Sequence, residues 1–249
     1  MRLSQLQSAS RVLIYGYGVE GQSTEKFLKA HQLKNFEIHD DKNEAYNSKK
    51  DLADYDIIII SAGINRLTVI PEALLDRCTS NTEMFFHNLS PANRRKTIGI
   101  TGTKGKSMTA KFAYELLQNN DKKVAIAGNY GNGLLDFLDQ MDDLEFIVME
   151  LSSFQLAYLN RSVHIAMCTN LFEDHLDWHG NKANYHAHKA NLWKYQTEAD
   201  FLYIPYRYCK DPSFETDGEK VVCGSLYHQF FEDEESIWHA QHYLQNFGL

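Results

Sequence analysis

The segment Ile100–Ser107 places glycines, lysines and a serine between an apolar stretch and a helix-like stretch. The preceding residues, Thr97–Thr101, are expected to form a buried strand, and Lys106–Gln118 have the pattern of a helix. A loop in this position can turn backbone amides toward an anion at the helix N-terminus. Lys106 offers a mobile charge for phosphate oxygens, and Ser107 offers a hydroxyl for Mg²⁺. The segment therefore predicts a phosphate-binding loop on a parallel α/β sheet.

This loop departs from the common nucleotide-binding form. Two residues separate Gly102 from Gly105 where four are usual, and Ile100 stands in the position of the first glycine. Gly-Lys-Ser also occurs in ordinary surface turns, so a structural turn is the alternative. The strand before the loop and the helix after it favour phosphate binding.

Strand and helix signals alternate along the chain, which predicts parallel sheets with crossover helices. Strands are expected at Arg11–Tyr15, Phe36–Asp40, Ile57–Ile60, Thr97–Thr101, Val124–Ala127, Phe146–Glu150, His164–Thr169 and Phe201–Ile204, and helices through Phe27 and Leu28, at Lys106–Gln118 and at Lys182–Tyr195. The expected fold class is α/β. A Rossmann-like domain would span residues 1–93, and a P-loop-type parallel-sheet domain would span residues 94–249, with a boundary in the polar stretch Ser90–Lys96.

Polar residues and glycines follow most of the expected strands. These segments are Gly16–Gly21, Asp40-Asp41, Ser61–Gly63, Gly102–Ser107, Gly128-Asn129, Glu150–Gln155 and Asn170–Asp177. In open parallel sheets, ligands bind at the carboxyl ends of the strands. We therefore expect binding sites at this edge of each sheet.

The first βα turn has the spacing Gly16-x-Gly18-x-x-Gly21, with Asp40 about twenty residues further on. This is the outline of a dinucleotide-binding turn, although any tight strand-to-helix turn favours glycine. A second mononucleotide-binding half is missing, so we expect a ligand other than a nicotinamide dinucleotide.

Two further segments carry groups that bind cations. Glu150 follows a strand near the phosphate loop, where an acid commonly anchors Mg²⁺, and the adjacent Ser152 also fits a helix cap. His175 and His179 are four residues apart, which suggests zinc, but the glutamate of a zinc-protease helix is absent between them. The position after an apolar strand favours a hard cation or a phosphate. By spacing alone, Lys189 would be an ordinary surface lysine.

Charge and composition limit the partners. The net charge of −8 disfavours nucleic acid, and no apolar run reaches membrane-spanning length. The first residues lack the apolar stretch of a signal peptide, and the four cysteines are scattered, as in reduced cytoplasmic proteins.

Together these segments resemble the Mur ligase family. The resemblance is carried by Thr101–Ser107, Gly128–Gly131, Glu150–Leu156 and Glu173–Asp177. The run Glu-Leu-Ser-Ser-Phe-Gln-Leu is similar to the branch that adds D-glutamate to UDP-N-acetylmuramoyl-L-alanine, and the short phosphate loop is this family's form. The resemblance implies a monomeric cytoplasmic ligase that uses ATP and Mg²⁺ in peptidoglycan precursor synthesis.

The resemblance also implies roles for individual residues. Lys106, Glu150, His175 and Lys189 would be catalytic, and one Mg²⁺ would lie at Ser107 and Glu150 and a second at His175 and a carbamylated Lys189. ATP would contact Gly102, Thr103, Lys104, Gly105, Lys106, Ser107, Met108 and Asn246. The muramoyl-alanine part would contact Asn129 and Ser152, and the uridine part would contact Val19, Glu20, Asp40, Asp41, Lys42, Ser61 and Gly63.

Several positions depart from the family pattern. Met108 replaces a threonine, Ala62 replaces a proline, and Ala240 and Tyr243 replace a glycine and an asparagine. The family has a third, C-terminal domain for the incoming amino acid, so we expect this chain to be a form without it. The rivals are a family member with another amino-acid or folate substrate, and a non-catalytic protein that binds a UDP-sugar or ATP.

Overall fold

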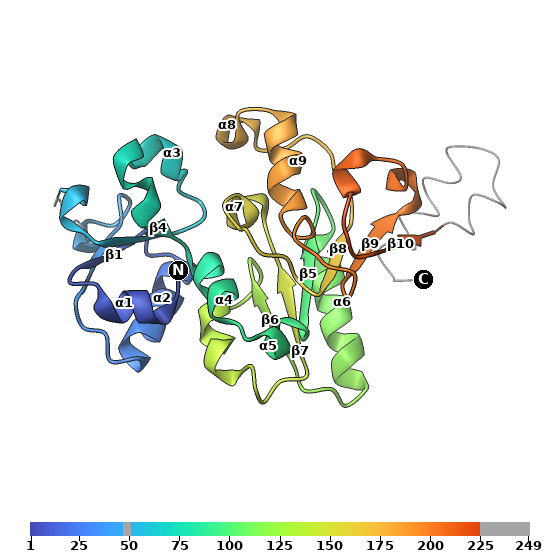
Figure 1. Cartoon of the computed structure of the whole chain (residues 1–249), viewed down its shortest axis with the longest axis horizontal. Helices are drawn as coiled ribbons and strands as arrows, with labels where there is room; N and C mark the ends of the chain where they lie inside the picture. Colours follow the sequence, from blue (N-terminus) through green and yellow to red (C-terminus); the bar gives the residue numbers. More distant parts are fainter. Residues whose placement is uncertain (47–50, 225–249) are drawn as a thin grey trace. The chain divides into compact units, whose positions relative to one another are not determined.

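A computed structural model describes residues 1–46 and 51–224 (Figure 1). The chain divides into two compact units: Met1–Ser90 with Gly131–Met141, and Pro91–Tyr130 with the chain from Asp142 onward. Each unit contains one sheet, and all strand pairs in both sheets are parallel. The predicted α/β fold class is confirmed.

The first unit is built on a four-stranded sheet of order β2-β1-β3-β4. Its strands are β1 (Val12–Tyr15), β2 (Phe36–His39), β3 (Ile57–Ile60) and β4 (Cys78–Thr79). Its helices are α1 (Leu3–Ser8), α2 (Val19–Ala30), α3 (Arg66–Val69) and α4 (Asn81–Asn88), with 3₁₀ turns η1 (Glu44–Tyr46), η2 (Leu52–Asp54), η3 (Glu72–Arg77) and η4 (Leu134–Gln140). Every residue of β3 is buried, because an unbroken isoleucine run suits a strand covered on both faces.

The second unit is built on a six-stranded sheet of order β10-β9-β8-β5-β7-β6. Its strands are β5 (Thr97–Thr101), β6 (Val124–Gly128), β7 (Phe146–Glu150), β8 (Ile165–Cys168), β9 (Phe201–Pro205) and β10 (Glu219–Cys223). Its helices are α5 (Pro91–Arg94), α6 (Lys106–Asn119), α7 (Ser153–Leu156), α8 (Leu176–His179) and α9 (Lys182–Ala190), with 3₁₀ turns η5 (Tyr206–Tyr208) and η6 (Pro212–Phe214). The inner face of α6 packs on Ile98, Ile100 and Val148.

The helix expected over Lys182–Tyr195 ends at Ala190, so this prediction was wrong in its C-terminal third. Beyond that point the backbone tightens, and the Leu192 and Trp193 amides donate to carbonyls three residues back. The Asn191 side chain donates to the Leu156 carbonyl at 2.9 Å, which holds the chain in this turn. Leu192 and Trp193 are buried as a result.

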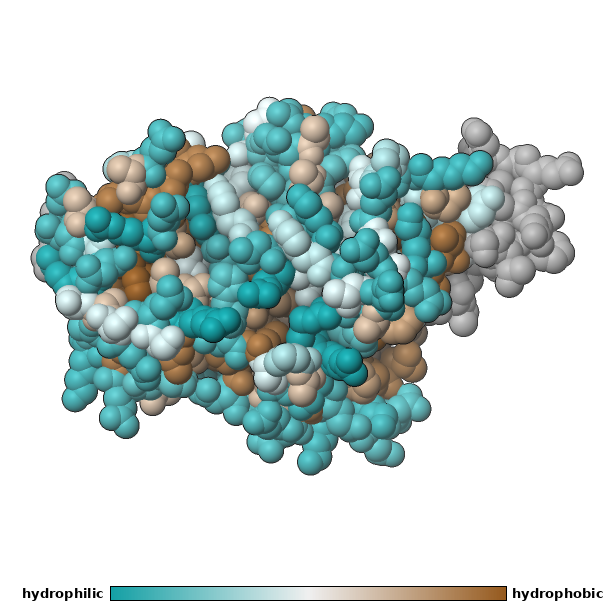
Figure 2. All heavy atoms as spheres, viewed as in Figure 1, coloured by the Kyte–Doolittle hydropathy of each residue, from teal (hydrophilic) through white to brown (hydrophobic). Residues whose placement is uncertain are grey.

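On the face drawn in Figure 2, hydrophilic residues cover most of the surface and hydrophobic residues lie in separate patches. The large apolar side chains most exposed to solvent include Leu67 and Val19 in the first unit and Met108 in the second. Within residues 1–46 and 51–224, no helix is long and apolar enough to cross a membrane.

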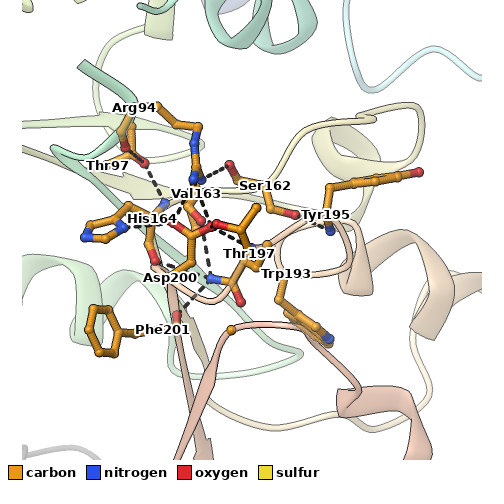
Figure 3. Close-up of polar contacts among 12 residues, drawn as sticks. Arg94, Thr97, Ser162, Val163, His164, Trp193, Tyr195, Thr197, Asp200 and Phe201 are labelled. Carbon is orange, nitrogen blue, oxygen red and sulfur yellow. Dashed lines mark hydrogen bonds and ion pairs between the residues drawn. The ribbon is translucent and has the colours of Figure 1, made fainter. Parts of the chain in front are cut away.

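A buried carboxylate, Asp200, ties together the segments that lead into β5, β8 and β9 (Figure 3). Arg94 donates to both of its oxygens at 2.7 and 2.8 Å, and His164 Nδ1 lies 2.9 Å from Oδ1. The Thr197 amide and hydroxyl donate to Oδ2 at 2.8 and 3.0 Å. Burial alone would raise the pKa of Asp200, but these hydrogen bonds outweigh it and hold the pKa below its ordinary value.

We predict that Asp200→Asn lowers the free energy of unfolding at pH 7 by about 3 kcal/mol, because Arg94 loses its charged partner. A carboxyl with a depressed native pKa stabilises the fold above its unfolded pKa and loses that contribution as pH falls through the native value. The difference between the two proteins in urea unfolding should therefore shrink below about pH 4. Asp217→Asn, at an exposed position of the same unit, serves as the control. Equal stability of Asp200→Asn and wild type at pH 7 would contradict this role.

Candidate functional site

The loop between β5 and α6 has the backbone that its glycines allow. Gly102 has φ 145° and Gly105, the N-cap of α6, has φ 83°. A Cβ at Gly102 would lie 2.0 Å from Thr169 Oγ1, so no larger residue fits without a shift of its neighbours. Both glycines are thus explained by their positive φ, and Gly102 is also required by its close packing against Thr169.

Thr169 and Asn170, which follow β8, hold this loop in place by hydrogen bonds. The Asn170 carbonyl accepts from the Thr103 amide at 2.9 Å, and Asn170 Oδ1 accepts from the Lys104 amide at 2.9 Å. Thr169 Oγ1 donates to the Lys104 carbonyl at 2.7 Å. Two loop amides therefore serve the fold, and an anion would instead meet the amides in the first turn of α6. Asn170 begins the polar segment that was expected at this edge of the sheet, but the role of Thr169 and Asn170 in holding the loop was not predicted.

Lys106 is half-buried rather than exposed as a mobile surface charge would be. Its Nζ donates to the Thr103 carbonyl at 3.0 Å, which folds the side chain back over the loop. Burial lowers the pKa of Lys106, and the nearby Glu150 carboxylate partly offsets that shift. Ser107 and Met108 follow it at the start of α6, and both are exposed.

Glu150 lies at the carboxyl end of β7 with its side chain 1% exposed. Oε1 accepts a hydrogen bond from Asn129 Nδ2 at 3.1 Å. Oε2 is buried and has no hydrogen-bond partner among the residues that the structure describes. A buried carboxylate oxygen without a partner is costly, and a hard cation would satisfy it. The donor chemistry of Glu150 therefore fits Mg²⁺.

Lys189 is 1% exposed, so the surface reading of this residue was wrong. Its Nζ donates to the Gly102 carbonyl at 2.8 Å and lies 4.8 Å from the centre of the Tyr185 ring. Tyr185 is one turn earlier on α9, so both side chains face inward. Burial, followed by the charge of Lys106, lowers the pKa of Lys189 to about 7. The carbamate hypothesis requires this direction, because only a neutral amine reacts with carbon dioxide.

His175 and His179 have different surroundings, and both ring nitrogens of His179 are already hydrogen-bonded. His175 has φ 51° at the N-cap of α8, and its ring lies 4.8 Å from the Phe154 ring, centre to centre. His179 is 3% exposed and is hydrogen-bonded to Ser153 Oγ at 3.0 Å and to His188 Nδ1 at 2.7 Å. Burial lowers the pKa of His179 to about 4.

The predicted metal ligands therefore need help from a ligand or water. Among residues 1–46 and 51–224, no three His, Cys, Asp or Glu side chains are close enough to hold a metal by themselves. Phosphate oxygens would supply the missing contacts, as is common for Mg²⁺.

Ser152 and Asn129 are held by local hydrogen bonds. Ser152 caps α7: its hydroxyl accepts from the Gln155 amide at 3.3 Å, and Gln155 Oε1 accepts from the Ser152 amide at 3.0 Å. The Asn129 amide donates to the Glu150 carbonyl at 2.8 Å, which joins the ends of β6 and β7. Both residues thus border Glu150 in the second unit.

The predicted uridine-binding residues lie at the carboxyl edge of the first sheet. The Asp40 carboxylate accepts from the Tyr17 and Lys42 amides at 2.6 and 2.8 Å, and these bonds lower its pKa. Asp41 accepts from the Tyr15 hydroxyl at 2.8 Å. Val19 and Gly63 are exposed, and Asn246 lies outside the described residues. Asp40 is therefore engaged with the backbone of its own turn.

Two side-chain hydrogen bonds join the segments that follow β1 and β3. Glu20 Oε2 accepts from the Ala62 amide at 2.8 Å, and Ser61 Oγ donates to the Gly16 carbonyl at 2.8 Å. Ala62 can donate this bond because it has the amide hydrogen that a proline would lack.

Comparison with known proteins gives a consistent family. Residues 100–239 match the model of the Mur ligase middle domain. The UDP-N-acetylmuramoylalanine–D-glutamate ligase of Thermotoga maritima is 29% identical over 250 residues, which are 85% of this chain and 56% of that protein. The enzyme of the same name from Thermotoga sp. strain RQ2 is 30% identical over 214 residues, which are 78% of this chain and 49% of that protein. The chain thus spans about half the length of these curated relatives.

Solved structures with a similar fold include a Mur ligase. It is the UDP-N-acetylmuramate:L-alanyl-gamma-D-glutamyl-meso-diaminopimelate ligase of Neisseria meningitides, with a TM-score of 0.52 at 13% identity, covering 86% of this chain and 78% of that one. The family match covers more than half of the sequence and includes the phosphate loop, Glu150 and Lys189. The chain belongs to the Mur ligase family.

Proposed function

We propose that this protein is an ATP-dependent ligase that joins D-glutamate to UDP-N-acetylmuramoyl-L-alanine. The main support for the proposal is that Lys106, Glu150 and Lys189 lie near one another around the phosphate loop, at the carboxyl edge of the second sheet. The names of the relatives support the D-glutamate branch. We further propose that residues 1–93 hold the uridine nucleotide and that residues 94–249 hold ATP.

The proposed reaction has two steps. The alanyl carboxylate attacks the γ-phosphorus of ATP, which forms an acyl phosphate and releases ADP. The D-glutamate amine then attacks the acyl carbon, an amide bond forms, phosphate leaves, and the amine loses its proton. Both steps bring anions together, so positioning and charge stabilisation supply much of the catalysis.

Lys106 and the first turn of α6 would hold the ATP phosphates in this scheme. Glu150 and Ser107 would hold one Mg²⁺, and His175 with a carbamylated Lys189 would hold another. Bound Mg²⁺ would offset the repulsion between the carboxylate and the phosphates. The buried Oε2 of Glu150 supports the first assignment, and the neutral-range pKa of Lys189 supports the second.

The carbamate would form from the unprotonated Lys189 amine and carbon dioxide. A nitrogen–carbon bond forms and one proton leaves to solvent, so a cation becomes an anionic oxygen ligand. At a pKa near 7 a large share of this amine is neutral at physiological pH, unlike that of an exposed lysine. ¹³C-bicarbonate NMR would show the carbamate carbon in wild type and not in Lys189→Met.

The function is tested with ATP, Mg²⁺ and UDP-N-acetylmuramoyl-L-alanine. We predict ADP formation that requires the muramoyl substrate, a hydroxamate when hydroxylamine traps the acyl phosphate, and a D-glutamyl product by mass spectrometry. Lys106→Met should weaken ATP binding about 100-fold, or ~2.7 kcal/mol, and leave uridine-nucleotide binding unchanged.

Lys111→Met is the matched control, since Lys111 is exposed on the same helix and its ion pair with Glu115 lies at the surface. Absence of both trapped hydroxamate and substrate-dependent ADP would overturn the ligase proposal. Unchanged ATP affinity in Lys106→Met would overturn the role of the loop.

A second prediction concerns the stability of the fold around Lys189. Below about pH 7 the native state must bury a charged amine, and this penalty is relieved as pH rises from about 7 toward the unfolded value of 10.5. In carbon-dioxide-free buffer, the unfolding free energy of wild type should therefore rise relative to Lys189→Met across this window, by on the order of 4 kcal/mol. Urea unfolding at pH 7, 8.5 and 10 measures it, with exposed Lys182→Met as control. A constant difference between wild type and Lys189→Met would show that Lys189 titrates normally.

A further inference from the structure

The side chain of Tyr185 contacts the phosphate loop from the same helix as Lys189. Its hydroxyl and Thr103 Oγ1 are hydrogen-bonded at 3.0 Å, and Lys189 Nζ donates to the Gly102 carbonyl at 2.8 Å. Tyr185 and Lys189 are one turn apart on α9, so they lie on one face of the helix. Two successive loop residues, Gly102 and Thr103, are therefore each held by a side chain of α9.

Packing alone gives no reason for the hydroxyl of Tyr185. Tyr185 and Thr103 are both buried. A buried hydroxyl is costly unless it is hydrogen-bonded, and a phenylalanine would fill the same space without that cost. The hydrogen-bond partner of this hydroxyl belongs to the phosphate loop. We therefore expect the hydroxyl to act on the loop rather than on the packing of α9.

Thr103 also holds the side chain of Lys106. The Thr103 carbonyl accepts a hydrogen bond from Lys106 Nζ at 3.0 Å. Thr103 Oγ1 accepts from the Phe172 amide at 2.9 Å, so this hydroxyl has partners in two other segments, α9 and the segment after β8. A hydroxyl oxygen can take part in several hydrogen bonds at once, which allows both contacts. Fixing Thr103 in this way also fixes the acceptor of the Lys106 ammonium.

The Tyr185 contact does not depend on the chemical state of Lys189. In the proposed function, a carbamate replaces the Lys189 amine that donates to the Gly102 carbonyl. The Tyr185 hydroxyl takes no part in that chemistry, so its hydrogen bond to Thr103 can persist. Tyr185 can therefore hold the loop both before and after Lys189 is modified.

We propose that Tyr185 is a positioning residue, which acts through Thr103 to hold the phosphate loop and Lys106 in place for the phosphates of ATP. This inference rests on the proposed function, which places ATP at this loop. A binding site that is held in its binding geometry loses less conformational freedom when the ligand binds. One hydrogen bond between neutral groups contributes modestly, so we expect weaker ATP binding without Tyr185 rather than none.

The test is titration calorimetry of the full chain with Mg²⁺ and a non-hydrolysable ATP analogue. Tyr185→Phe removes the hydroxyl and keeps the ring, and it should weaken binding about fivefold. In a Thr103→Val background, which lacks Oγ1, Tyr185→Phe should cause no further loss, because both changes remove the same contact. Tyr55→Phe is the control and should leave the affinity unchanged. Tyr55 is also buried, and its hydroxyl donates to Glu37 at 3.1 Å in the first unit.

Equal affinity of Tyr185→Phe and wild type would show that the hydroxyl does not position the loop, while the ATP site would stand. The inference would also be wrong if Tyr55→Phe weakened binding as much, since a general loss of stability would then explain the effect. It would be wrong as well if Tyr185→Phe weakened binding as strongly in the Thr103→Val background. If wild type did not bind the ATP analogue, both the ATP site and the inference would fall.

Discussion

The hydrogen bond from Lys189 Nζ to the Gly102 carbonyl is the contact on which the second unit's site depends. It joins the last turn of α9 to the first residue of the phosphate loop across 2.8 Å. A buried ammonium needs a partner, and the carbonyl of Gly102, a residue with φ 145°, provides it. Burial lowers the pKa of Lys189, and the charge of the nearby Lys106 lowers it further. The conformation of the phosphate loop and the chemistry of Lys189 therefore depend on the same contact.

Buried polar groups differ between the two ends of the strands of the second sheet. At the amino ends of β5, β8 and β9, the Asp200 carboxylate has hydrogen bonds from Arg94, His164 and Thr197. At the carboxyl ends, Glu150 keeps a buried oxygen without a partner in the described part of the chain, and Lys189 is buried next to another lysine. A buried carboxylate oxygen without a partner and a buried lysine with a lowered pKa are costly to the fold and typical of functional sites. The Asp200 network stabilises the sheet, whereas Glu150 and Lys189 point to a ligand.

Much of the fold was predictable because the strongest signals are local. The runs Ile57–Ile60 and Thr97–Thr101 are strands with the predicted bounds, and α6 begins at Lys106 as its glycine cap indicates. β4 and β10 were not predicted, since one has two residues and the other is half-exposed. The predicted C-terminal end of α9 was wrong because the chain turns there, and a tertiary hydrogen bond from the Asn191 side chain holds that turn.

The phosphate loop could be predicted from the sequence, but the residues that hold it in place could not. The spacing of Gly102, Gly105 and Lys106 predicts the loop. The hydrogen bonds to it from Thr169 and Asn170 depend on β5 and β8 being neighbours in the sheet. Periodicity placed Lys189 at the surface because α9 is polar around most of its circumference. Only the packing of α9 against the loop reveals a buried amine, and no residue spacing contains that information.

The most direct test is a crystal structure of the protein with Mg²⁺ and a non-hydrolysable ATP analogue. We expect phosphate oxygens at the first turn of α6 beside Lys106 Nζ, and Mg²⁺ bound to Glu150 Oε2 directly or through one water. A nucleotide bound away from the Gly102–Ser107 loop would contradict this expectation. So would a Mg²⁺ ion held without Glu150 while Oε2 stayed buried and unpartnered.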